Sequence, residues 1–127
     1  MARVFEVSIT TGFAAAHRLD CYPGDCRRIH GHNWRVDVFV QCRALDDLGM
    51  GIDFRDIETH AREVVGGLDH RLLNDLDFFA DKNPTAENVA VYVYRGMQGL
   101  IDREGVRVTK VRVFESPGAG VTYWEED

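Results

Sequence analysis

The amino-acid sequence predicts an α+β fold in which a four-stranded antiparallel sheet carries two helices packed on one face. Two segments with strand character come first, two segments with helical periodicity follow, and a hairpin-like pair of segments ends the chain. Hairpins on either side of a helical pair favour a single antiparallel sheet covered on one face by both helices. The length of 127 residues suits one domain, spanning 1–127.

The first two strands are predicted from the alternation of apolar and polar residues. The segment VFEVSIT at 4–10 alternates enough to indicate a strand, and WRVDVFVQ at 34–41 alternates more clearly. In the second segment one face is apolar and consists of Trp34, Val36, Val38 and Val40. We therefore expect a sheet with one face against the core and one polar face.

The two helices are predicted from the change to a helical period. Apolar residues recur at helical spacing between 54 and 68, where Asp53 is a suitable N-cap. A second helix is expected from about 86 to 103, capped by Thr85 and closed by Gly105.

The end of the chain predicts a final hairpin. VRVTKVRVFE at 106–115 and VTYW at 121–124 indicate strands on either side of the turn sequence PGAG. The expected sheet leaves its polar face and its edges uncovered, and assembly with further subunits is one way to cover them. Oligomerisation is therefore expected from the pattern.

Composition and charge exclude several classes of function. The net charge of −6 argues against a nucleic-acid partner, because binding to phosphate backbones depends on clustered cations. No run approaches the roughly 20 apolar residues that a membrane helix needs, and the N-terminus carries no apolar stretch of signal-peptide length. We expect a cytoplasmic protein without a membrane partner, whose three cysteines form no disulfide framework.

Three histidines have the spacing expected of a metal site. His30 and His32 flank Gly31, so in an extended chain both imidazoles point to the same side. His17 follows the first strand, and a hairpin would bring it to the same end of the sheet as the other two. Three imidazoles can hold Zn²⁺ and leave one coordination position open, as in catalytic zinc sites. His60, inside the first helix, is interpreted as structural.

Cys26 lies four residues before His30 and has three readings. As a thiolate it can complete a closed, structural zinc site. If it does not bind the metal, it can act as a base or nucleophile whose pKa is lowered by Arg27, Arg28 or a nearby cation. It can also be an inert buried thiol. The residue's position alone leaves these alternatives open.

Two further stretches are candidates for chemistry. Asp69 and His70 are adjacent, and a carboxylate can fix the tautomer of an imidazole and raise its basicity. Glu115 ends a predicted strand, where it can accept hydrogen bonds from a planar heterocycle or simply be solvated.

The ordered set of motifs resembles the 6-pyruvoyltetrahydropterin synthase family, which includes the bacterial 6-carboxytetrahydropterin synthases. The motifs are FAAAHRL, CxxxHGHN, GMGIDF, LDHxxLN, PTAENVA and FES, and they span about residues 5–123. The resemblance implies the tunnelling fold, in which trimers close their sheets into a barrel and two trimers stack into a hexamer with active sites between subunits.

The resemblance also implies roles for individual residues. His17, His30 and His32 match the zinc ligands, Cys26 matches the catalytic cysteine, and Asp69 with His70 matches the relay that accompanies it. Glu115 matches the residue that anchors the pterin ring, with Thr85 as a helper. The departures are Trp34, where a smaller aromatic residue is usual, and Ser116, where threonine is common.

The function implied is a zinc-dependent lyase acting on 7,8-dihydroneopterin triphosphate. In one branch of the family the products are 6-carboxy-5,6,7,8-tetrahydropterin, a queuosine precursor, with acetaldehyde and triphosphate. In the other branch only triphosphate leaves and the product is 6-pyruvoyltetrahydropterin. The short connection between Asn74 and Pro84 favours the carboxy branch. Arginines near the histidines are candidate triphosphate contacts: Arg18, Arg27, Arg28 and Arg35. A non-catalytic structural zinc module remains the alternative from a different class.

Overall fold

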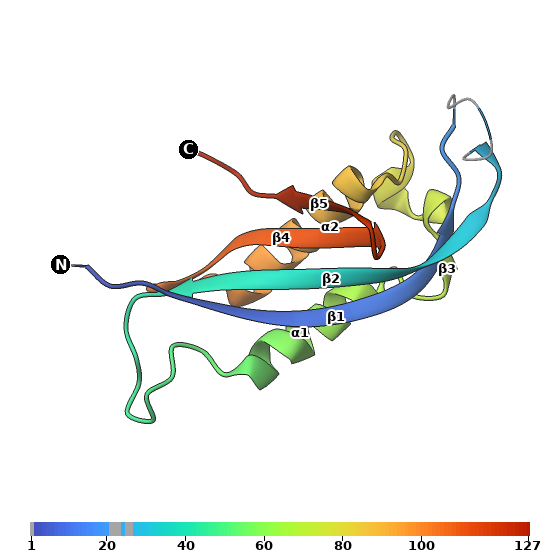
Figure 1. Cartoon of the computed structure of the whole chain (residues 1–127). Coiled ribbons are helices and arrows are strands. Elements are labelled where there is room, and N and C mark those ends of the chain that lie inside the picture. Colours follow the sequence, from blue (N-terminus) through green and yellow to red (C-terminus); the bar gives the residue numbers. More distant parts are fainter. Residues whose placement is uncertain (1, 21–23, 25–26) are drawn as a thin grey trace.

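The computed structural model describes residues 2–20, 24 and 27–127 of the chain, and this part consists of one sheet and two long helices (Figure 1). The elements follow in the order β1 (Phe5–His17), β2 (His30–Cys42), α1 (Phe54–Gly66), β3 (Arg71–Leu72), η2 (Leu73–Asp75), η3 (Asp77–Phe79), α2 (Ala86–Ile101), β4 (Val106–Ser116) and β5 (Ala119–Tyr123). The α+β class predicted from the sequence is therefore confirmed.

The sheet has five strands, not the four that the sequence predicts. Its spatial order is β3-β1-β2-β4-β5, and the pairs β1–β2, β2–β4 and β4–β5 are antiparallel. The fifth strand, β3, contains two residues and pairs in parallel with β1 at Ala15 and Ala16. A two-residue strand has no alternation to detect, and only the approach of α1 to β1 creates it, so the sheet is mixed rather than purely antiparallel.

The first hairpin is longer than the alternation indicates. β1 and β2 pair over 13 residues each, from Phe5 opposite Cys42 to His17 opposite His30. The predicted segments 4–10 and 34–41 cover only part of this ladder. The extension of β1 contains three alanines, whose small side chains give little apolar contrast, although inward and outward positions still alternate there.

The helix caps agree with the sequence at both N-termini. The Asp53 carboxylate accepts a hydrogen bond from the Arg55 amide at 2.8 Å, and the Thr85 hydroxyl accepts one from the Asn88 amide at 3.1 Å. Such caps satisfy backbone N–H groups that the first helical turn leaves unpaired. The second helix ends at Ile101, earlier than predicted, and Gly105, with φ of 78°, lies in the turn to β4 instead of closing the helix.

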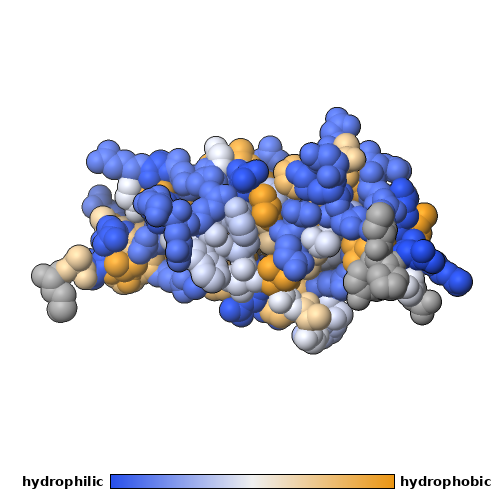
Figure 2. Space-filling model, turned by 90° about the horizontal axis from the view of Figure 1, so that it is seen from above, coloured by the Kyte–Doolittle hydropathy of each residue, from blue (hydrophilic) through white to orange (hydrophobic). Residues whose placement is uncertain are grey.

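The core lies between one face of the sheet and the two helices. Alternate residues of the central strands are fully buried there, each contributing roughly 1.5–3 kcal/mol by its burial, and they pack with apolar residues of both helices: Val36, Val38, Val111, Val113, Ile57, Val93 and Met97. Seen from above, the molecule presents a largely hydrophilic surface with small separate hydrophobic spots (Figure 2). Among the described residues, no helix combines the length and the apolar character that crossing a membrane requires.

Candidate metal centre

The paired ends of β1 and β2 bring together three histidines, which we call the histidine cluster: His17, His30 and His32. His17 is the register partner of His30, and His32 lies opposite Ala15. Because cross-strand partners and residues two apart share a face, all three rings lie on the core-facing side of the sheet. Their ring centroids are 4.6, 4.9 and 5.3 Å apart. The predicted approach of His17 to the other two is confirmed, and it follows from the ladder register.

Backbone carbonyls orient two of the three rings. The Nδ1 atom of His17 lies 2.7 Å from the Pro84 carbonyl oxygen, and that of His30 lies 2.8 Å from the Arg28 carbonyl oxygen. A carbonyl oxygen only accepts hydrogen bonds, so each Nδ1 carries the proton and donates it. In the neutral rings the Nε2 lone pair is then free, which is the state that a metal ligand requires.

The free nitrogens point to a shared space that also contains a carboxylate. The Nε2 atoms of His17 and His32 are buried and have no hydrogen-bond partner among the described residues. The Oε1 atom of Glu115 lies 2.9 Å and 3.4 Å from them, without the alignment of a hydrogen bond. Lone pairs and a carboxylate at such distances repel one another unless a cation lies among them.

The donor set fits a zinc ion. One donor atom from each of four residues lies within 4.8 Å of all the others: His17, His30, His32 and Glu115. A tetrahedral Zn²⁺ at about 2.0–2.1 Å from nitrogen and oxygen ligands holds neighbouring ligands about 3.3 Å apart. The separations between Glu115 and the two imidazoles are close to this value, and imidazole with carboxylate is a donor combination that zinc accepts.

The protonation state of His17 also suits a metal ligand. Burial lowers its pKa, because the charged imidazolium loses hydration in the interior. The Pro84 carbonyl and the Glu115 carboxylate oppose this effect, and the other two histidines add to it. A lowered pKa favours the neutral ring at physiological pH, and a neutral ring does not compete with a metal ion for its own lone pair.

Trp34 forms the inner wall of the histidine cluster. Its ring centroid lies 5.1 Å from that of His17 and 5.8 Å from that of His32, in edge-on contacts. The indole N–H donates to the Ala15 carbonyl at 3.2 Å, and the ring stacks on Phe13. A large aromatic ring fixed in this way restricts the rotamers of the imidazoles that touch it. In the sequence, Trp34 is placed on the apolar face of its predicted strand and is a departure from the family pattern, but neither observation predicts this contact with the histidines.

The Asp69–His70 pair is formed, although adjacency alone does not predict it. The Nδ1 atom of His70 lies 2.9 Å from Oδ2 of Asp69, and His70 adopts a left-handed backbone conformation with φ of 58°. Asp69 also accepts a hydrogen bond from the Ala14 amide at 2.9 Å. These hydrogen bonds, the one from Ala14 first, lower the pKa of Asp69 and keep it ionised at neutral pH.

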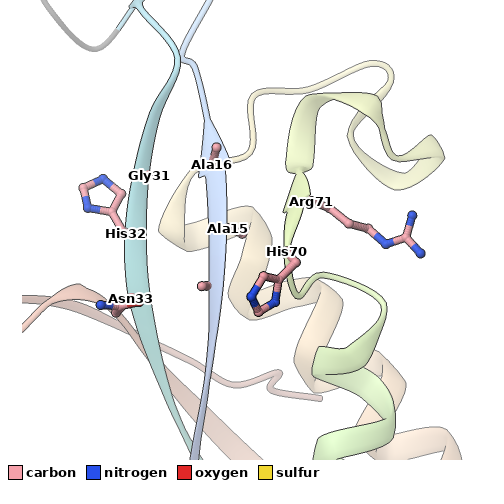
Figure 3. Close-up of a pocket in the computed structure, with 8 residues that line it drawn as sticks. Ala15, Ala16, Gly31, His32, Asn33, His70 and Arg71 are labelled. Carbon is pink, nitrogen blue, oxygen red and sulfur yellow. The ribbon is translucent and has the colours of Figure 1, made fainter.

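The Asp69–His70 pair is not directed at the histidine cluster of its own chain. Figure 3 shows the His32 ring beside β2 and the His70 ring beside β3, with β1 between them. Both rings line an open pocket of about 470 Å³, and the His70 side chain is 82% exposed. Neither member of the pair belongs to the set of four donors that lie within 4.8 Å of one another.

Two asparagines hold the chain that follows β1, and the sequence analysis assigned them no role. Asn74 accepts from the Arg18 amide at 2.9 Å and donates to its carbonyl at 3.1 Å. Asn83 makes the same pair of bonds with Asp20, at 2.9 and 3.0 Å. Asn74 ends the motif LDHxxLN and Asn83 directly precedes the motif PTAENVA, and this position was the available signal. They secure the start of the connection from β1 to β2, whose predicted residue Cys26 lies outside the described residues.

Other predicted site residues have partners of their own. The Thr85 hydroxyl caps α2, directly after the Pro84 carbonyl that orients His17. Arg35 makes two hydrogen bonds to Asp37 and lies over the Phe114 ring, while Arg18 pairs with Asp20. These two arginines therefore already have partners within their own chain. Of the four predicted phosphate contacts, Arg27 and Arg28 have exposed side chains without an ion pair in the described part of the chain.

Comparison of the sequence with known proteins identifies a family and several relatives. The profile of a family described as 6-pyruvoyl tetrahydropterin synthase matches residues 6–126. A putative 6-carboxy-5,6,7,8-tetrahydropterin synthase of Archaeoglobus fulgidus is 34% identical, covering 87% of each chain. The 6-carboxy-5,6,7,8-tetrahydropterin synthase of Bacillus subtilis is 33% identical, covering 94% of this chain and 84% of its own. The 6-pyruvoyl tetrahydrobiopterin synthase of Homo sapiens is 34% identical, covering 93% and 90%.

Structural comparison gives a consistent result. The Caenorhabditis elegans 6-pyruvoyl tetrahydropterin synthase superposes with a TM-score of 0.86 at 27% identity, covering 98% of each chain. A protein of Wolinella succinogenes, described as uncharacterized, has the same fold with a TM-score of 0.80 at 21% identity.

Proposed function

Because this chain belongs to the 6-pyruvoyl tetrahydropterin synthase family, we propose that it is a lyase that converts 7,8-dihydroneopterin triphosphate to 6-carboxy-5,6,7,8-tetrahydropterin. Several relatives named for the 6-carboxy product support this reading. The observation that carries the proposal is the histidine cluster, in which carbonyls orient His17 and His30 and the buried Nε2 atoms of His17 and His32 have no partner among the described residues.

The reaction balances without an external reductant. Cleavage of a carbon–carbon bond in the side chain releases its last two carbons as acetaldehyde. The triphosphate is released as a separate product. The carbon that stays on the ring is oxidised to a carboxylate, with water supplying oxygen, while the ring is reduced from the dihydro to the tetrahydro level. The electrons removed from the side chain therefore reduce the ring.

The residues present fit Zn²⁺, which His17, His30 and His32 would hold. When bound there, the ion supplies Lewis acidity that stabilises negative charge on side-chain oxygens of the substrate. The Pro84 and Arg28 carbonyls fix two of the rings by hydrogen bonds at 2.7 and 2.8 Å. Outer-shell partners of this kind orient metal ligands and raise their basicity.

Cys26, Asp69 and His70 are the proposed proton-transfer residues. In the Asp69–His70 pair, Nδ1 of the ring faces the ionised carboxylate at 2.9 Å, so Nε2 is the atom that takes and releases protons. The carboxylate stabilises the imidazolium that forms when His70 accepts a proton. Cys26 would move a second proton at the side-chain carbons.

Glu115 and Thr85 are proposed to bind the pterin ring. Fixing the ring sets the distance between its side chain and the proton-transfer residues, and such orientation contributes several kcal/mol to catalysis. Arg27 and Arg28 are the proposed triphosphate contacts, because their side chains are exposed and the charge of a leaving triphosphate favours guanidinium partners.

We further propose a homo-oligomer, a hexamer built as a dimer of trimers, with sites between subunits. The exposed His70 ring, separated by β1 from the histidine cluster, supports this proposal. In such an assembly the histidine cluster of one subunit is completed by the Asp69–His70 pair of another.

The deciding experiment incubates the purified, zinc-loaded protein with 7,8-dihydroneopterin triphosphate and measures acetaldehyde and triphosphate. Release of both in equal amounts supports the carboxy product. Triphosphate without acetaldehyde supports the pyruvoyl product, the alternative that the human relative favours. Absence of both products contradicts the proposal.

A structural zinc module is the remaining alternative, and Cys26→Ala separates it from the enzyme. In the enzyme the variant keeps its zinc and its fold but loses turnover. In a structural module closed by Cys26 it loses zinc and unfolds. Metal content and circular dichroism of the variant distinguish the two outcomes.

A further inference from the structure

Glu115 lies where a substrate oxygen would have to bind. Its Oε1 atom is 2.9 Å from Nε2 of His17 and 3.4 Å from Nε2 of His32, inside the four-residue donor set. These separations match the edges of a zinc tetrahedron, about 3.3 Å. If the carboxylate served only to bind a pterin ring, its oxygen would not need to lie within this donor set.

The backbone at Glu115 is released from the sheet ladder. The β2–β4 register ends with Arg35 opposite Phe114, and the β4–β5 register is irregular between Phe114 and Ser116, so Glu115 has no register partner on either neighbour. Such an irregularity re-aims a side chain and frees it from ladder hydrogen bonds. The Glu115 side chain is 32% exposed, so it has space on the solvent side to change its rotamer.

We propose that Glu115 is the fourth protein ligand of the metal ion in the substrate-free protein, and that binding of a pterin withdraws it. This inference rests on the proposed function, whose metal site and substrate class it uses. The carboxylate exchanges one partner for another: it leaves the ion and accepts hydrogen bonds from the N–H groups of the ring. Recognition of the ring thereby opens the coordination position that the side-chain oxygens need.

This exchange makes the metal site selective. A molecule with hydroxyl groups but no pterin ring cannot offer Glu115 a new partner, so it must displace a bound carboxylate without compensation. A closed resting site also keeps small anions and water from the ion. The two roles of Glu115 are then successive states of one side chain.

The test uses protein loaded with Co²⁺, whose visible absorption reports the number and type of ligands, and thiocyanate as a small competing anion. In substrate-free wild-type protein we expect little thiocyanate binding. In Glu115→Gln and Glu115→Ala we expect at least tenfold tighter thiocyanate binding with a changed Co²⁺ spectrum. The variants should also bind the metal at least about tenfold more weakly, since even loss of an outer-shell partner costs 10–100-fold.

A matched control is Glu63→Gln, which removes the charge of an exposed glutamate 3.6 Å from His60. It should leave the Co²⁺ spectrum and thiocyanate binding unchanged. Glu115→Gln preserves side-chain volume, and circular dichroism establishes that each variant is folded. Equal thiocyanate affinity in wild type and both Glu115 variants overturns the inference.

The second arm adds a dihydropterin that has no side chain. This ring should tighten thiocyanate binding to wild-type protein and should have no such effect in Glu115→Ala. Neither arm depends on turnover, so the outcomes separate. A protein that turns over substrate but binds thiocyanate equally with and without Glu115 loses this inference alone. Protein that shows Glu115 ligation but no turnover loses the proposed function alone.

Discussion

The histidine cluster and the Asp69–His70 pair differ in how completely their own chain builds them. His17 is fully buried, hydrogen-bonded through Nδ1 and walled by Trp34. The His70 ring is 82% exposed and has only its neighbour Asp69 as a charged partner within the described chain. Figure 3 shows the rings of His32 and His70 on different sides of β1.

The difference separates two requirements of the same reaction. Metal ligands must be dehydrated and rigid, because each misplaced ligand weakens coordination, and the core side of a long hairpin supplies both conditions. A proton-transfer residue must reach the substrate, and the exposed ring of His70 meets this requirement of its proposed role. One chain therefore contains a buried set of candidate metal donors and an exposed Asp69–His70 pair that does not face this set.

The largest effect is expected for His17→Ala, which should abolish turnover and lower zinc affinity by more than about a hundredfold. The variant removes one of three imidazoles and leaves the Pro84 carbonyl without its donor. Zinc content after dialysis is the measurement. His60→Ala is the control, since His60 lies in α1 outside the donor set, and it should keep its zinc. Stoichiometric zinc in His17→Ala would show that the cluster is not the metal site.

The division between subunits is tested by mixing two inactive variants. His32→Ala lacks a metal ligand and His70→Ala lacks the proton-transfer ring, so each alone should lose activity by at least about a hundredfold. Reassembled together, about a quarter of the sites should combine two intact halves at random and recover activity. Turnover after mixing is compared with each variant reassembled alone. If mixed oligomers form but activity does not recover, both halves of the site belong to one chain.

A smaller effect is expected for Trp34→Phe. The variant loses the indole N–H that donates to the Ala15 carbonyl, and loss of one such hydrogen bond costs about 0.5–1.5 kcal/mol in unfolding free energy. Zinc affinity should fall up to about tenfold, because the wall behind two imidazoles shrinks. Denaturant unfolding and zinc competition measure the two effects. Trp124→Phe, at a 53% exposed position, should change neither.

The smallest effect concerns the pH dependence of stability at Asp69. Hydrogen bonds from Ala14 and His70 lower the native pKa of this carboxyl below the ordinary aspartate value of about 3.9. Its contribution to stability is therefore complete above that value and is lost as the pH falls through the lowered native pKa. Asp69→Asn should be less stable than wild type at pH 7, with a difference that narrows below pH of about 4. Urea unfolding at both pH values checks this, and a constant difference contradicts it.

Much of this protein is determined by short-range pattern in the sequence. The alternation at 34–41, the helical spacing after Asp53 and the capping hydroxyl of Thr85 each act within a few residues, and the structure reproduces them. The same holds for the H-x-H spacing, because a strand puts residues two apart on one face. The approach of His17 needed one further assumption, a hairpin, which the chain order favours.

Only the tertiary structure decided the features that depend on long-range register. The strand β3 forms because the chain after α1 brings Arg71 and Leu72 to the edge of β1. A segment of two residues has no alternation from which this pairing can be predicted. Glu115 enters the donor set because the ladder irregularity near the end of β4 turns it toward His17. His70 lies beside β1 because its amide donates to the Ala14 carbonyl, a contact between residues 56 positions apart. Such placements result from the summed packing of distant segments, whereas pattern and spacing report only what each segment does by itself.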